Sequence, residues 1–214
     1  MADIKRKGYG QVEPNHLSGI VEGRIYAQLP AGTASSATTT KTVGEDQNAQ
    51  TYTTTTITIT PIAQLEQGQF AKYDYATGVV NFNGAGDFML VYNEEKLYDE
   101  RKQSHKDFVY KAADFTDKMM YPRLIATEVG DIITTNTIHE SNTSNTAEVT
   151  IGTDTELVVG TYLQPSTSTG FLEVLKSGNT VVTSLTGVSG MVWKIVKVYT
   201  MPDGQPGFKI QRIQ

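Results

Sequence analysis

The sequence predicts a mainly β chain that folds as an antiparallel barrel or sandwich with an extended N-terminal arm. A block rich in Tyr, Phe and Val spans residues 69–98 and is broken by Thr77-Gly78 and by Asn83-Gly-Ala-Gly86. In residues 52–60, Ile57 and Ile59 fall on one face of a strand and Thr54, Thr56, Thr58 and Thr60 on the other, and short apolar segments separated by turn residues follow from residue 68 onward. Aromatic and β-branched residues favour strands, and Gly and Asn pairs favour tight turns.

The composition fits exposed strands better than a large core. The chain has 214 residues, of which 38% are hydrophobic and 9% aromatic, and about thirty are Thr. Thr forms strands and tolerates solvent, so its abundance predicts exposed strands and extended segments. A chain of this length forms one β domain or two small ones.

Residues 1–50 differ in character from the rest of the chain and are the predicted arm. They begin with Lys5-Arg6-Lys7, continue with several Gly and Pro residues, and end in a Thr/Ser/Ala tract around residues 30–40. We expect one strand at residues 19–28; by composition alone, a disordered tail is an equal alternative. Residues 51–214 are the predicted β-rich domain, with a possible subdivision near residues 138–147.

Strict alternation predicts a half-buried strand at residues 52–60, with Ile57 and Ile59 on one face and Pro61 ending it. Residues 93–106 are rich in charge, and their pattern fits either a solvated helix or a hairpin or exposed loop. The other strands are expected at residues 69–75, 79–83, 88–93, 124–127, 131–137, 148–151, 156–163, 170–175, 180–185, 191–200 and 208–213.

Several classes of partner and site are not expected. The formal net charge is −5 and no basic block is present, so nucleic acid is not an expected partner. The absence of Cys removes disulfides and Cys-based metal sites. No apolar segment approaches the roughly 20 residues of a membrane helix, and no apolar stretch follows the basic start as in a secretory signal. We therefore expect a protein made and kept soluble in the cytoplasm, without a membrane partner.

The sequence offers no catalytic constellation, so we expect a protein that is not an enzyme and needs no cofactor. His139-Glu140 is the one pair typical of a metal or acid/base element, and an exposed His at a strand end is the preferred interpretation. His16 lies in the arm and His105 in a charged segment. Gly84-Ala-Gly86 precedes a strand-like run rather than a helix, which favours a β-turn over a phosphate loop.

Four segments of the chain resemble virion structural proteins of tailed bacteriophages. They are GQFAKYDYATG (68–78), FMLVYNEEKLY (88–98), YPR (121–123) and VGDIITTN (129–136). The resemblance covers roughly residues 65–165 together with the arm-like start. It implies an auxiliary capsid protein of the virion, present in many copies or as a homo-oligomer, that binds the major capsid protein and decorates or cements the shell.

Within this interpretation, the arm is the candidate element for contact with the shell. Backbone hydrogen bonds formed by strand addition would supply affinity, and many copies on a symmetric shell would add avidity. The candidate contact residues in the arm are Lys5, Arg6, Lys7, Tyr9, Arg24 and Tyr26.

Three alternatives remain open from the sequence. A tail or neck component would use similar β surfaces to form a ring. A carbohydrate-binding module for host recognition would use exposed Tyr side chains and Trp193 as stacking surfaces, although aromatics at alternating strand positions are more often core residues. A glycosidase would need two converging carboxylates, and no pair is apparent.

Overall fold

The computed structural model describes residues 2–3, 9–44, 49–92, 109–140, 156–201 and 204–214. Within these residues the chain is mainly β, as predicted, with one four-residue α-helix and one 3₁₀ turn. The largest sheet has the strand order β1-β13-β15-β14-β18-β19-β12-β2. Its strands are β1 (Ala2–Asp3), β2 (Val12–His16), β12 (Ile132–Thr135), β13 (Ile138–Glu140), β14 (Tyr162–Pro165), β15 (Leu172–Val174), β18 (Trp193–Thr200) and β19 (Pro206–Arg212).

A second sheet has the order β3-β11-β9-β7-β8. Its strands are β3 (Ile25–Tyr26), β7 (Phe70–Asp74), β8 (Val79–Asn81), β9 (Phe88–Val91) and β11 (Leu124–Ile125). Two strands, β6 (Gln64–Glu66) and β10 (Val109–Lys111), pair beside it, and two more, β16 (Lys176–Ser177) and β17 (Thr180–Val181), form a small hairpin. The helix α1 is Ser18–Val21, and the 3₁₀ turn spans Ala112–Asp114.

The main core lies between the eight-stranded and five-stranded sheets. Phe70 and Leu90 of the five-stranded sheet belong to one buried cluster with Trp193, Phe208 and Ile210 of the eight-stranded sheet. The rings of Phe70 and Trp193 are tilted, with centroids 5.5 Å apart. The arrangement is therefore compatible with a sandwich, and the described strands form no closed barrel. Trp193 is completely buried, which rules out its predicted alternative role as an outward stacking surface.

The other face of the five-stranded sheet is also covered. Its apolar residues Tyr73 and Leu124 form a second buried cluster with Leu65 and Tyr110 of β6 and β10 and with Met120. Because both faces are packed, the aromatic block at 69–92 contributes chiefly to the core, as its alternation predicts. Tyr75 is the exception, because it lies after the end of β7 and its side chain is 73% exposed.

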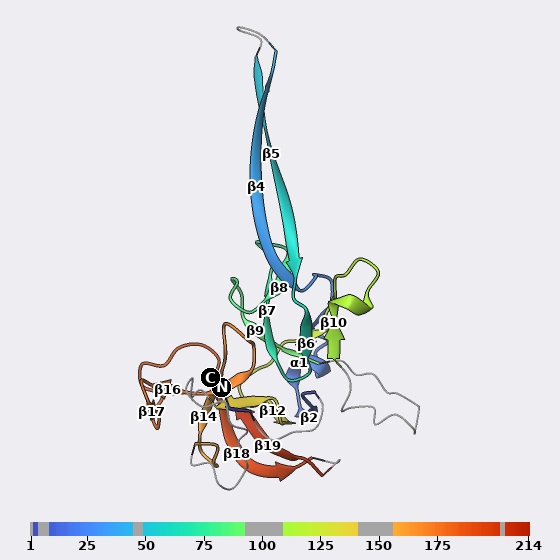
Figure 1. Cartoon of the computed structure of the whole chain (residues 1–214). Helices are drawn as coiled ribbons and strands as arrows, with labels where there is room; N and C mark the ends of the chain where they lie inside the picture. The colour runs from blue at the N-terminus through green and yellow to red at the C-terminus, as the bar shows by residue number, and fades with distance from the viewer. Residues whose placement is uncertain (1, 4–8, 45–48, 93–108, 141–155, 202–203) are drawn as a thin grey trace.

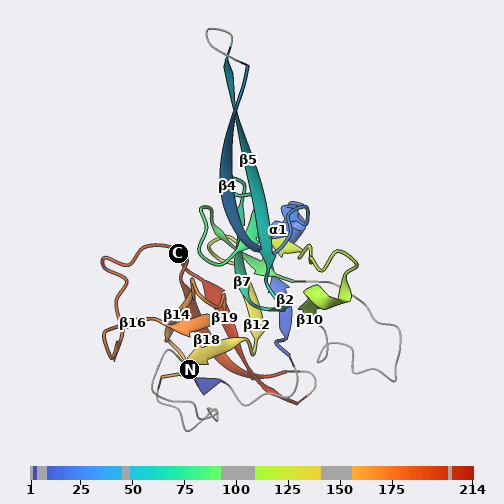
Figure 2. The same ribbon diagram turned by 45° about the horizontal axis from the view of Figure 1, so that its top comes forward.

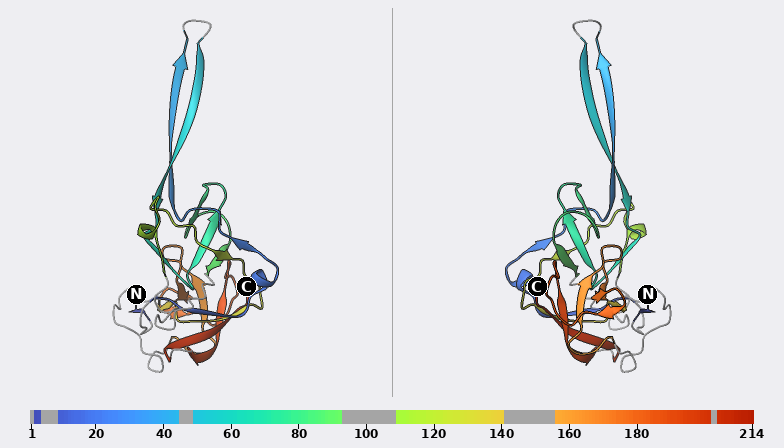
Figure 3. Two further views of the ribbon diagram at one scale, coloured as in Figure 1. Left: turned by 90° about the vertical axis from the view of Figure 1, so that its right-hand side faces the viewer. Right: turned by 90° about the vertical axis from the view of Figure 1, so that its left-hand side faces the viewer.

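A two-stranded hairpin projects from this body. Its strands are β4 (Gly32–Val43) and β5 (Gln50–Pro61), and they lie well clear of the two packed sheets in every view (Figures 1, 2 and 3). The extended element of the structure therefore runs from residue 32 to residue 61, and the predicted boundary at residue 50 is the first residue of its second strand.

The predicted arm differs from the structure in its first half. Within residues 9–31, β2 pairs with β12 in the large sheet and β3 pairs with β11 in the smaller one. The single strand predicted at 19–28 is divided between α1 and β3. Gly19 of α1 packs so closely on the chain that a Cβ at this position would collide with the carbonyl group of Ala126.

The possible subdivision near residue 138 has no counterpart in the sheets that are described. The parallel pair β13–β15 and the antiparallel pair β12–β19 place strands from both sides of it in the same eight-stranded sheet. Residues 141–147 lie outside the described part of the chain, as do the segment 93–106 and the strand expected at 148–151.

Candidate functional site: a projecting β-hairpin

The hairpin β4–β5 is the most unusual feature of the described structure. Its strands pair antiparallel over all twelve residues, from Gly32 opposite Pro61 to Val43 opposite Gln50. At about 3.4 Å per residue, this ribbon is roughly 40 Å long. Strand β5 is rich in Thr and Ile, which are good β formers, and it provides a partner along the whole length of the Ser/Thr/Ala-rich β4.

The ribbon has two faces of different chemistry. One face carries Ala34 opposite Ile59 and Ser36 opposite Ile57, followed towards the tip by three Thr–Thr pairs. The other face is hydroxyl-rich near the body and carries Lys41 opposite Tyr52 close to the tip. The two isoleucines therefore lie at the body end of one face, whereas Tyr52 and Val43 lie near the tip on the other face.

Nearly the whole ribbon is open to solvent. All residues of β4 beyond Ala34 are exposed, and so are all residues of β5 up to Thr58. Ile57, Tyr52 and Val43 are 57%, 55% and 51% exposed, respectively. A two-stranded hairpin without further burial is only marginally stable in water. The outer edge of each strand also presents unpaired N–H and C=O groups that can accept another strand.

The root of the hairpin is anchored firmly in the body. Ala31 is completely buried, bridges in parallel to Val80 of β8, and donates its N–H to the carbonyl of Met120 over 2.8 Å. Ile62 donates in turn to the carbonyl of Ala31 over 3.2 Å. An isolated bridge thus ties the start of the ribbon to β8, the edge strand of the five-stranded sheet.

The contact residues predicted for the arm do not gather on the hairpin. Lys5, Arg6 and Lys7 lie outside the described residues. Tyr9 lies beneath the ammonium group of Lys111, which is 5.3 Å from its ring centre.

Arg24 and Tyr26 are engaged within the body. Arg24 forms ion pairs with Glu22 and Glu128 at 2.8 and 2.7 Å, and the ring of Tyr26 packs on Tyr73 with centroids 5.3 Å apart. Their predicted role as free contact residues of a shell-binding arm is therefore not supported by their positions.

The other element with possible chemistry is the His139-Glu140 pair. His139 is nearly buried and its ring stacks on Phe171 with centroids 3.8 Å apart, so the predicted exposed His at a strand end is wrong. The burial follows from its strand, because β13 lies inside the large sheet between β1 and β15. His16 is exposed at the end of β2, and His105 is outside the described residues. The part of the chain that the structure describes contains no group of three metal-ligating side chains.

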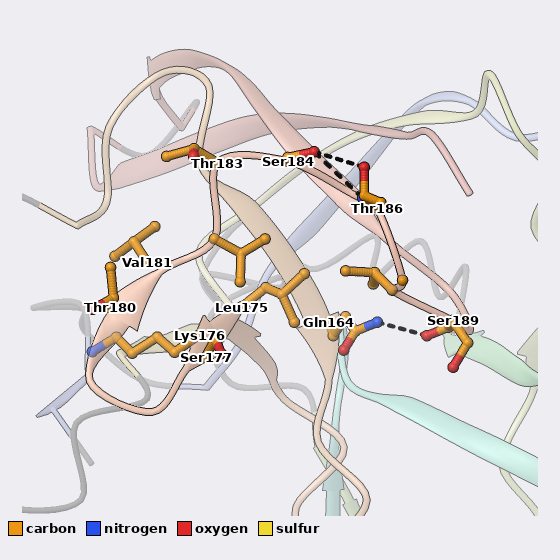
Figure 4. Close-up of a pocket in the computed structure, with 13 residues that line it drawn as sticks. Gln164, Leu175, Lys176, Ser177, Thr180, Val181, Thr183, Ser184, Thr186 and Ser189 are labelled. Atoms are coloured by element: carbon orange, nitrogen blue, oxygen red, sulfur yellow. Dashed lines mark hydrogen bonds between the residues drawn. The ribbon is translucent and has the colours of Figure 1, made fainter.

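An open pocket of about 590 Å³ lies beside the loop that follows β16 and β17 (Figure 4). Hydroxyl groups dominate its lining; Ser184 and Thr186 are hydrogen-bonded to each other at 3.1 Å, and Gln164 donates to the carbonyl of Ser189. Its one charged lining residue, Lys176, forms a 2.6 Å ion pair with Glu156. Among the described residues that line it, none is a His, Asp or Glu that could act as a base toward these hydroxyls.

Neither a family model, nor a curated protein, nor a solved structure matches the chain. Among the described residues, no helix has the length and apolar character needed to cross a membrane. The hairpin therefore has to be interpreted from its own geometry and chemistry.

Proposed function

We propose that this chain is a non-enzymatic structural protein of a phage virion, of the auxiliary capsid type, and that the β4–β5 hairpin is its assembly element. The observation that carries the proposal is the ribbon of two twelve-residue strands, about 40 Å long, that projects from the body and is largely exposed to solvent. In this proposal the partner is the major capsid protein, and the protein is made in the host cytoplasm and resides in the virion.

The hairpin suits a contact with a neighbouring subunit for two physical reasons. Its open edges can add to a strand of the neighbour, so that backbone hydrogen bonds supply affinity. Its hydroxyl-covered faces remain soluble before assembly, whereas Ile57 and Ile59 provide apolar area once covered. A single ribbon offers a small interface, but many copies on a symmetric shell increase the overall affinity without new contacts.

Shell binding can be tested with purified capsid shells that lack the protein. Wild-type protein is compared with a variant in which residues 34–59 are replaced by Asn-Gly, which joins the opposed residues Thr33 and Thr60 through a two-residue hairpin turn. We expect saturable co-sedimentation of the wild type and its loss in the shortened variant. Raised thermal stability of the shells would indicate cementing, and binding alone would indicate decoration.

The matched control is Tyr75→Ala, which changes an exposed aromatic residue on the body and leaves the hairpin intact. Circular dichroism and thermal unfolding must show that both variants fold. Full binding by the folded, shortened variant would refute the role of the hairpin, and absence of wild-type binding would refute the capsid assignment.

A tail or neck component is the second candidate, because a projecting ribbon with open edges can equally link the subunits of a ring. Size-exclusion chromatography with light scattering separates the two assignments. A closed ring of fixed copy number that does not bind shells would favour the tail or neck assignment.

A further inference from the structure

The outer surface of strands β14, β18 and β19 carries a cluster of lysines. Ile195 of β18 lies opposite Ile210 of β19, and both are completely buried on the inner face. Because side chains alternate along a strand, Lys194 and Lys209 lie on the outer face. Lys197 joins them, because a β-bulge between Ile195 and Lys197 brings it directly opposite Lys209.

Two tyrosines complete this outer surface. Lys194 lies 5.7 Å from the ring centre of Tyr162, and Lys209 lies 5.5 Å from that of Tyr199. We call these five residues the lysine face: Tyr162, Lys194, Lys197, Tyr199 and Lys209.

The three lysines of the lysine face form no ion pair among the described residues, and the carboxylate nearest in the strand register is Glu13, which lies two strands from Lys209 on the same face. Lys197 and Lys209 occupy directly opposed positions, where like charges are about 4.5–5.5 Å apart at Cβ and destabilise the sheet. The excess of positive charge is confined to this surface, because the whole chain has a formal net charge of −5.

The strand next to the lysine face has an open edge. Strand β14 pairs with β18 only at Tyr162–Lys194 and Leu163–Trp193, and the backbone of Ile195 bonds to residues 160 and 161. Beyond this point, the described residues pair with β18 on its β19 side alone. Val196 and Val198 on this free stretch are 37% and 41% exposed. Bonds between the backbones of Gly160 and Ile195 place the exposed pair Val158-Val159 near the same edge.

We infer that this edge and the lysine face together form a second docking surface, for an extended acidic segment of a partner protein. The segment adds as a strand along the free part of β18, so that its backbone pairs with the open edge. Its carboxylates neutralise Lys197 and Lys209, and its apolar side chains contact Val196 and Val198. The surface lies at the end of the body away from the hairpin and is independent of the hairpin assignment (Figures 1 and 3).

The charge pattern also disfavours pairing of this edge with a second copy of the chain. A lysine and a bulge on an edge strand are common devices against edge-to-edge association. Two copies that meet through β18 would bring four lysines of positions 197 and 209 close together. The carboxylates of an acidic strand are instead attracted to these lysines. The same residues therefore disfavour a second copy and favour an acidic partner.

Three lysines on an acidic protein favour a protein segment over nucleic acid. Neutralising about three phosphates gives only a weak, strongly salt-dependent contact, and the net negative charge of the chain opposes a polyanion. A short peptide adds backbone pairing and valine contacts, which do not depend on charge.

The test uses the full chain and a fluorescein-labelled peptide, Glu-Val-Glu-Val-Glu-Val-Glu, with a Lys-Val peptide and a labelled oligo-dT of twelve nucleotides as comparators. We expect fluorescence anisotropy to show binding of the acidic peptide that weakens with salt, and no binding of the Lys-Val peptide. Lys197→Glu should weaken acidic peptide binding at least about tenfold. Lys118→Glu, which makes the same charge change at an exposed position elsewhere, should leave it unchanged.

Thermal unfolding distinguishes a lost docking charge from a damaged fold. Lys197→Glu replaces a like-charge pair by an opposite-charge pair, so its Tm should rise by up to about 4 °C while its peptide binding falls. Preferential binding of the oligonucleotide would overturn the proposal in favour of nucleic acid. Absence of any peptide binding, or equal losses in Lys197→Glu and Lys118→Glu, would overturn it outright. Shell co-sedimentation is not used, so this outcome is separate from that of the hairpin experiment.

Discussion

The root of the hairpin allows a quantitative prediction, because the two strands approach each other most closely at Gly32. A Cβ at this position would lie 2.6 Å from Cγ2 of Ile59 and 2.7 Å from the carbonyl oxygen of Thr60. Both distances are shorter than real Cβ contacts, and the second involves backbone that has little freedom to move. The backbone of Gly32 is outside the left-handed region, so lack of space alone demands glycine.

The Gly32→Ala variant should therefore be overpacked at the root. Inserting a methyl group into a filled site costs about 1–3 kcal/mol of unfolding free energy. For a chain of this size, each kcal/mol lowers Tm by about 2–4 °C, so we expect a decrease of about 2–12 °C. Differential scanning calorimetry measures this shift. Because the root sets the direction of the ribbon, shell binding should also weaken.

A double-mutant cycle with Ile59→Ala separates the two contacts. Removing the Ile59 side chain frees the space around Cγ2, so the Gly32→Ala penalty should be smaller in the Ile59→Ala background than in the wild type. It should not vanish, because the contact with the Thr60 carbonyl remains. An unchanged Tm for Gly32→Ala would refute the close approach, and a fully additive cycle would refute the part assigned to Ile59.

Three further predictions concern the body. Trp193→Ala should lower the unfolding free energy by about 3–5 kcal/mol in chemical denaturation, because the ring is completely buried against Phe70; a loss below about 1 kcal/mol would contradict that packing. Arg24→Gln should destabilise the fold by no more than about 1 kcal/mol, because its two ion pairs are partly exposed, and should leave shell co-sedimentation unchanged; a selective loss of shell binding would restore Arg24 as a contact residue. The side-chain hydrogen bond with Thr77 lowers the pKa of Asp74 below its ordinary value. The carboxylate therefore stabilises the fold above the unfolded-state pKa, about 3.9, and this stabilisation is lost as the pH falls through the folded-state pKa. The Tm difference between wild type and Asp74→Asn should shrink on acidification. A Tm difference that is independent of pH would contradict this.

The sequence is informative where local patterns and tertiary packing agree. Strands β7, β8 and β9 lie within the segments predicted at 69–93, because their apolar residues alternate and Gly78 and Gly86 adopt positive φ in the turns between them. The two longest strands of the large sheet, β18 and β19, also lie close to their predicted bounds.

The sequence is misleading where a partner far away in the chain decides the outcome. Strand β4 has almost no apolar residues and resembles a disordered tract, but it forms because β5 provides a matching partner along its whole length. The alternation of β5 was itself a signal that a second strand was required. Strand β2 was hidden by its Pro and polar residues, and it is held by contacts such as the Gln11 N–H donating to Oδ1 of Asn136, 125 residues away.

The candidate sites show the same limit. A basic cluster and isolated aromatics suggested contact residues, but Arg24 and Tyr26 find partners inside the body. The sequence does not reveal the lysine face, because its lysines come from β18 and β19 and only the register between these strands brings Lys197 opposite Lys209.

The contrast between the hairpin and the large sheet has a consequence for the order of folding. Only six residues separate Val43 from Gln50 in the sequence, so the pairing of β4 with β5 is local and can begin within microseconds once residues 32–61 are available. Strand β2 pairs with β12, more than a hundred residues further along, and such distant pairings form slowly. During synthesis β4 and β5 can therefore pair, with only marginal stability, while the earlier segment 12–16 still lacks its neighbour β12. A chain stalled at that stage would expose the paired hairpin while the eight-stranded sheet is still incomplete.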